Sequence, residues 1–129
     1  MVNKAIGSVR RIAYMKIPKD KNYVGFPRAS LSHYADEARE YIKVPVFEEP
    51  LDDILNSLGI DKIDLTKVNI EGYVTQALLG AIDSLSKTKY LIIEIFEEEF
   101  RYVHRKLREL GFRLVDARGL SYLYRNLKT

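Results

Sequence analysis

Apolar positions in the second half of the chain follow a pattern that predicts alternating helices and strands. A short helix is indicated after Pro50, because its apolar residues share one face, acidic residues occupy its first turn and Gly59 follows its end. Two longer helices carry apolar residues three and four positions apart, one over Val74–Leu85 and one that begins at Glu97 and ends before Gly111. The strands predicted between and after these helices are 62–70, 90–96, 112–117 and 120–126.

The order of these elements predicts an α/β fold. Strands that alternate with helices form right-handed βαβ units and a parallel sheet. The nearly continuous apolar run of residues 90–96 is typical of a strand covered on both faces. The last two strands are joined by Arg118-Gly119, and a two-residue connection with glycine predicts an antiparallel hairpin. We therefore expect a three-layer α/β domain whose sheet is mostly parallel and ends in an antiparallel hairpin.

The first third of the chain has a weaker pattern. Alternation over residues 12–17 predicts a strand, and the polar stretch that follows it predicts a loop. Residues 30–42 have apolar positions at helical spacing. Pro45 favours extended backbone outside the centre of a sheet, because proline has no amide hydrogen to donate. Residues 1–129 are thus expected to form one domain, with 1–45 as a lead-in to a core over 46–129.

Composition excludes several classes of protein. The chain has no cysteine, which excludes a disulfide scaffold, a thiolate metal site and a cysteine nucleophile. Its two histidines are too few for a histidine-rich zinc site. No apolar run approaches the ~20 residues that cross a bilayer, and the N-terminus leads into no signal-type apolar segment. We expect a soluble cytoplasmic protein, and the abundance of Lys, Arg, Glu and Ile is typical of a thermophile.

Charge is distributed unevenly along the chain. Residues 1–45 carry a net charge of +5, residues 46–99 carry −8 and residues 100–129 carry +6. Basic ends with tyrosines such as Tyr122 and Tyr124 are able to contact phosphates and stack on bases. No nucleic-acid motif accompanies them, so solvated faces are the favoured interpretation and nucleic acid is not an expected partner. Any such binding is predicted to be weak, non-specific and sensitive to salt.

Residues 63–73 carry the most specific motif in the chain, with the sequence Ile-Asp-Leu-Thr-Lys-Val-Asn-Ile-Glu-Gly-Tyr. They resemble the signature of the FkbM family of S-adenosylmethionine-dependent methyltransferases, a strand of the type D-L-x-K-x-D-x-E-G-x-E that leads into a helix ending in L-x-G-A. Residues 78–81, Leu-Leu-Gly-Ala, supply that ending. The resemblance runs from about Val44 to Phe112 and is fainter at residues 5–7. It implies a Rossmann-like methyltransferase fold and methyl transfer to a hydroxyl oxygen.

Two departures from the family pattern limit what the resemblance implies. The family binds its cofactor with a glycine-rich loop after the first strand and an acid after the second, and neither is found in this sequence. Asn69 also replaces an acid of the signature, and Val74 replaces another. The chain therefore resembles the C-terminal portion of the family, and we expect a truncated relative that does not bind S-adenosylmethionine alone. The alternatives are an active O-methyltransferase whose cofactor half is supplied by a partner chain, and a non-catalytic interaction or weak nucleic-acid-binding module.

Asn69, Glu71 and Gly72 are the candidate residues for catalysis and cofactor binding. They follow a predicted strand, at the carboxyl edge where α/β sheets place ligands. Glu71 either positions a ligand or serves as the acid favoured near a helix N-terminus, and the second role is preferred. Gly72 allows a tight turn in either case.

Three other positions are expected to be structural. Lys67 is predicted either to reach an edge or to pair with a carboxylate such as Glu94 on the neighbouring strand, and pairing is the preferred alternative. His33 and His104 each stand alone, so they are expected to be packed or at the surface, and no metal site is predicted.

The resemblance also leads to an expectation about assembly. In the related fold, the first strand lies beside the strand of residues 64–70, so a chain without it leaves that strand with an unpaired edge. Such edges favour pairing with another chain. A homodimer with two such edges paired across a two-fold axis is expected, and the alternative is that residues 1–17 fold back over the edge.

Overall fold

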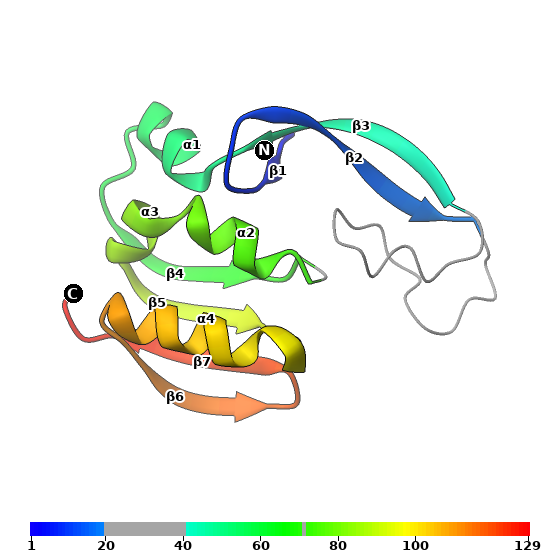
Figure 1. The fold of residues 1–129 in the computed structure, drawn as a ribbon. Helices are drawn as coiled ribbons and strands as arrows, with labels where there is room; N and C mark the ends of the chain where they lie inside the picture. Colours follow the sequence, from blue (N-terminus) through cyan, green and yellow to red (C-terminus); the bar gives the residue numbers. More distant parts are fainter. Residues whose placement is uncertain (20–40, 71) are drawn as a thin grey trace.

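The described residues of the computed structural model, 1–19, 41–70 and 72–129, form two separate sheets and four helices (Figure 1). The α/β class is confirmed, and no helix among these residues is long and apolar enough to cross a membrane. A three-stranded sheet has the order β1-β3-β2, and a four-stranded sheet has the order β4-β5-β7-β6. The elements are β1 Ala5–Ile6, β2 Arg11–Pro18, β3 Tyr41–Glu49, α1 Leu51–Ser57, β4 Ile63–Val68, α2 Val74–Leu79, α3 Ile82–Ser86, β5 Thr88–Glu94, α4 Glu97–Glu109, β6 Phe112–Arg118 and β7 Ser121–Asn126.

The four-stranded sheet is mixed, so the prediction of a mostly parallel sheet is wrong. β4 and β5 are parallel, whereas β7 is antiparallel to both of its neighbours, β5 and β6. The hairpin is confirmed, but its last strand lies inside the sheet, because β7 carries the fully buried Tyr124 and the buried Asn126. The Asn126 side chain donates to the backbone oxygen of Thr88 at 3.0 Å and so holds β7 beside the start of β5. β6 is mostly exposed and forms the edge.

Helices α2, α3 and α4 lie on one face of this sheet (Figure 1). This follows from chain order, because two right-handed crossovers that advance in the same direction place their helices on the same face. No described helix covers the opposite face, where Leu65 is 55 % exposed, so the third layer of the prediction is not formed by the described residues. The core between helices and sheet consists of Val74, Leu78, Ala81, Leu85, Leu91, Ile93, Ile95, Val103, Leu107, Phe112 and Tyr124.

The single helix predicted over residues 74–85 is broken into α2 and α3 at Gly80. A side chain at position 80 would place its Cβ 1.9 Å from the carbonyl oxygen of Gly7, so this close approach of the two backbones requires glycine at position 80. The Asp52 carboxylate then caps α3 by accepting from the Ser84 backbone N–H and hydroxyl, both at 2.7 Å. The Asp52 N–H donates in turn to the Gly80 oxygen at 3.0 Å. Contacts from distant segments therefore end a helix that its own sequence would continue.

The three-stranded sheet holds the N-terminal part of the chain. The strand predicted at 12–17 is confirmed as β2, which pairs antiparallel with β3. The predicted helix is wrong at Tyr41 and Ile42, which belong to β3 because they pair with β2; the rest of the predicted loop and helix, including His33, lies outside the described residues. β3 is the middle strand, yet Pro45 fits because β1 pairs only with Glu48 and Glu49 and leaves β3 with one neighbour at Pro45.

β4 lies at an edge of its sheet, with β5 as its only paired neighbour among the described strands. Residues 1–17 do not fold back onto it as a ladder partner, because β1 and β2 pair with β3. The unpaired edge expected from the sequence is therefore present.

The contact between Gly80 and Gly7 yields a stability prediction. Gly80→Ala should lower the free energy of unfolding by about 2 kcal/mol or more, because the added methyl group meets backbone that has no rotamer to change. Gly59→Ala is the matched control: Gly59 has φ +65° and open space around it, so only the cost of a left-handed alanine, about 1 kcal/mol, applies. Urea unfolding of both variants measures the difference. An equal or smaller loss for Gly80→Ala would show that the two backbones are not in firm contact.

Candidate functional site

The candidate residues from the sequence lie where β4 gives way to α2. Asn69 follows β4 and is exposed, and Gly72 adopts φ +82°, a left-handed conformation that the turn into α2 requires. Tyr73 then caps the start of α2. Glu71 lies outside the described residues. Asn69 and Gly72 are thus found at the predicted carboxyl edge of the sheet.

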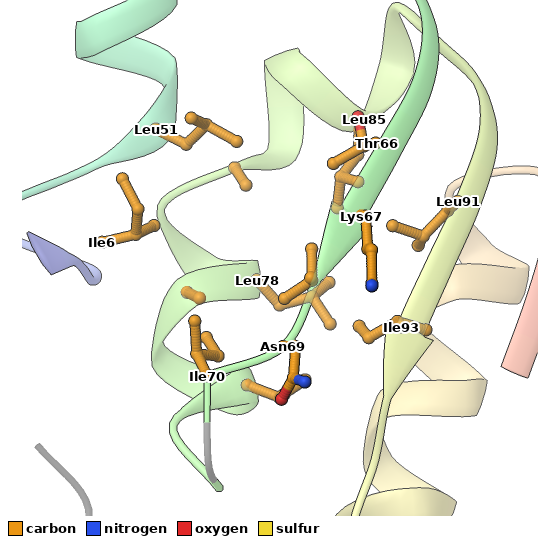
Figure 2. A pocket seen from close by; sticks show the side chains of 14 residues that line it. Ile6, Leu51, Thr66, Lys67, Asn69, Ile70, Leu78, Leu85, Leu91 and Ile93 are labelled. Atoms are coloured by element: carbon orange, nitrogen blue, oxygen red, sulfur yellow. The ribbon is translucent and has the colours of Figure 1, made fainter. Parts of the chain in front are cut away.

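A cavity of about 270 Å³ lies beside this turn (Figure 2). Its lining includes five consecutive residues, 66–70. Because successive residues of a strand point to opposite faces, a cavity that touches all five runs along the edge of β4. Ile6 and Leu51 form the wall across from β4, and the apolar side chains of α2 and β5 form the floor (Figure 2).

The lining of this cavity is almost entirely apolar. Of the described residues that line it, the polar ones are Thr66, Lys67 and Asn69. Thr66 is already engaged, since its hydroxyl lies 3.0 Å from that of Thr88. The remaining lining residues are Ile6, Leu51, Val68, Ile70, Val74, Ala77, Leu78, Ala81, Leu85, Leu91 and Ile93.

A polar network around the buried Glu48 side chain joins the N-terminal sheet to the turn that carries Gly72. Glu48 has a fully buried side chain, and its two oxygens accept from the Tyr73 hydroxyl at 2.8 Å and from Arg11 Nε at 2.6 Å. Arg11 also donates to the Tyr73 oxygen at 3.1 Å, so each side chain contacts the other two. Burial, and next the hydrogen bond to Glu48, raise the pKa of Tyr73, which keeps its hydroxyl protonated as the donor.

Ion pairs of Glu49, the residue after Glu48, also hold the N-terminal segment in place. Glu49 pairs with Lys4 and, at 3.1 Å, with Arg10. The hydrogen bond from Lys4 holds the pKa of Glu49 below its usual value. Arg10 also bonds to Asp53 of α1 at 3.1 Å. The segment that carries Ile6 is thereby fixed across from β4.

The other described residues singled out in the sequence are Lys67 and His104. Lys67 is exposed and forms no ion pair with a described carboxylate, so its expected pairing with Glu94 is wrong. His104 is packed as expected: its ring stacks on Phe100, and Nδ1 lies 2.8 Å from the Tyr124 hydroxyl. Burial raises the pKa of Tyr124 to about 12, so this hydroxyl stays protonated. No cluster of three metal-ligating side chains occurs among the described residues.

Several residues of the site were not predicted from the sequence. The wall residues Ile6 and Leu51 and the Glu48–Arg11–Tyr73 network reach the turn from distant positions in the chain. No local pattern marks such contacts.

The fold and the site define an α/β domain with its candidate residues at the carboxyl edge of a βαβ unit. Comparison with known families then identifies it. The sequence matches the methyltransferase FkbM domain over residues 4–114, and the chain therefore belongs to the FkbM methyltransferase family. The match extends the resemblance from the signature to the N-terminal strands. No curated protein and no solved structure matches the chain.

The residues around the cavity do not fit S-adenosylmethionine, the cofactor that the family resemblance implies. That cofactor carries a charged amino acid group, a ribose diol and a sulfonium, all of which require polar partners when bound. Among the described residues no carboxylate lines the cavity, and its volume lies below the ~300 Å³ at which small-molecule sites begin. An apolar slot beside a strand edge is instead suited to a polypeptide segment.

The hydrogen bond between Tyr73 and Glu48 leads to a prediction about stability. Tyr73→Phe should lower the free energy of unfolding by about 1–3 kcal/mol, because it leaves a buried Glu48 oxygen without its donor. Tyr14→Phe, on an exposed tyrosine of β2, is the matched control and should change stability little. Thermal unfolding followed by circular dichroism compares the two. Equal stability of both variants would mean that Tyr73 does not satisfy Glu48 in solution.

Proposed function

We propose that these residues form the second half of an FkbM-type S-adenosylmethionine-dependent O-methyltransferase. In this proposal the chain neither binds the cofactor nor transfers a methyl group until a segment from outside its 129 residues completes the sheet. The observation that carries the proposal is the unpaired edge of β4 beside an apolar cavity of about 270 Å³. Family membership supports the reaction class.

The apolar cavity along the open edge of β4, called the slot below, has the properties that an added strand would need. Backbone groups on the open edge of β4 have no described ladder partner, and a strand added there would satisfy them. Apolar side chains of that strand would fill the cavity and make packing contacts that the residues lining it now lack. Ile6 and Leu51 bound the slot on its far side and favour a narrow occupant.

Asn69 has a limited role in this proposal. Its side-chain amide is able to donate and accept hydrogen bonds, but it does not take up a proton. It is exposed at the mouth of the cavity, at the carboxyl edge of the sheet. We therefore assign Asn69 to positioning a ligand and not to general-base catalysis. Gly72 serves the turn, and Glu71 remains a candidate ligand contact.

The first test is cofactor binding by the chain alone. Calorimetric titration with S-adenosylmethionine should give no appreciable heat of binding, since no carboxylate of the described residues lines the cavity beside β4. A micromolar dissociation constant at one site per chain would contradict the proposal.

The same open edge supports a second proposal, that the isolated chain forms a homodimer. Two β4 strands paired across a two-fold axis would satisfy each other's backbone groups. Light scattering at high micromolar concentration should give twice the monomer mass. Leu65→Lys, at a 55 % exposed position on β4, should shift the protein towards the monomer, because edge lysines oppose strand pairing. Leu79→Lys, at a 51 % exposed position on α2, is the control and should remain dimeric.

A monomeric parent protein would contradict dimer formation and leave the cofactor proposal unaffected. Equal loss of mass in both variants would place the interface away from β4.

A further inference from the structure

A second cavity lies at the other end of the sheet, where α4 ends and β6 begins. Its volume is about 380 Å³, within the range of small-molecule sites. The buried Phe112 forms part of its lining together with Leu114 and Leu127. Because β6 runs parallel to β5, its first residue lies at the amino edge of the sheet, opposite the edge that carries Asn69.

Cationic side chains surround this cavity. Arg108 of α4 and Arg113 of β6 line it, and both are exposed. Lys128 is held beside them, because its aliphatic carbons pass over Gly111, about 3 Å from where a Cβ would stand. His104 lines the same cavity.

These charges are not neutralised by the acids nearby. Glu109 is paired with Lys106 at 3.1 Å, and Asp116 is paired with Arg118 at 3.6 Å. Neither Arg108 nor Arg113 forms an ion pair with any carboxylate among the described residues. Like charges that converge on one cavity without a counter-ion repel each other, and a bound anion would relieve that repulsion.

Attraction of these basic residues to the negative C-terminal end of α4 is the simplest alternative explanation. The local backbone weakens that explanation at the cavity. The Lys106 carbonyl accepts a hydrogen bond from the Leu110 N–H, and the Arg108 carbonyl accepts one from the Gly111 N–H, both at 3.0 Å. Two of the terminal carbonyls are thus satisfied within the chain and are less available to the basic side chains.

We propose that this cavity binds the phosphate group of a small phosphorylated molecule. The planar guanidinium groups of Arg108 and Arg113 match the geometry of phosphate oxygens and bind them in bidentate fashion. Phe112, Leu114 and Leu127 provide an apolar surface for the organic part of the ligand. This site is separate from the β4 edge and does not depend on the proposed methyltransferase function.

Titration with inorganic pyrophosphate, followed by amide NMR shifts, tests the site. Saturable shifts should concentrate at Gly111, Arg113 and Leu127, and Arg108→Gln combined with Arg113→Gln should weaken binding tenfold or more. Arg101→Gln combined with Arg118→Gln removes the same charge elsewhere and is the control, which should bind pyrophosphate as the parent does. Unchanged thermal unfolding of both variants would exclude a loss of fold.

Three outcomes would overturn the proposal. Non-saturable shifts would indicate general attraction to a basic protein, and equal weakening by both pairs of substitutions would show that the cavity is not involved. Tighter binding of a single-stranded oligonucleotide than of pyrophosphate, with the same dependence on Arg108 and Arg113, would assign the surface to a nucleic-acid backbone instead.

Discussion

The structure depends on a constraint set by β4, which is hydrogen-bonded on one side and open on the other. Parallel strands are normally buried between neighbours, because their backbone groups and apolar side chains both need cover. β4 has one such neighbour, β5, and the expected place of the second is an apolar slot. The sheet is therefore paired on the β5 side of β4, and in our proposal a further strand continues it on the other side.

Two sets of contacts hold the wall of this slot in position. The backbone contact between Gly7 and Gly80 brings the N-terminal segment against the break between α2 and α3, at a separation that a side chain at position 80 would not allow. The hydrogen-bonded network of Glu48, Arg11 and Tyr73 fixes the same segment to the turn after β4. Since both contacts join residues far apart in the chain, the wall of the slot forms only once the two sheets have come together. The position of Ile6 opposite β4 is thus a product of tertiary structure.

The sequence allowed the elements after Pro50 to be predicted well, because each has a local signal: capping acids, glycines at helix ends and apolar residues at regular spacing. The break at Gly80 and the location of β7 could not be predicted in that way. The first depends on Gly7 and Asp52, and the second depends on which strand buries Tyr124 and Asn126. The signature at residues 63–73 led to the family, since its residues are adjacent in sequence. Asn69 and Gly72 were found where expected for the same reason.

The most direct test of the account is amide hydrogen exchange along β4, with and without a completing polypeptide. That polypeptide would carry the glycine-rich strand and the acidic strand of an FkbM-family methyltransferase. At a concentration where the isolated chain is monomeric, residues 63–70 should become protected in the mixture, and S-adenosylmethionine should bind the mixture but neither component alone. Unchanged exchange at β4, with no cofactor binding by the mixture, would contradict the account and favour a non-catalytic interaction module.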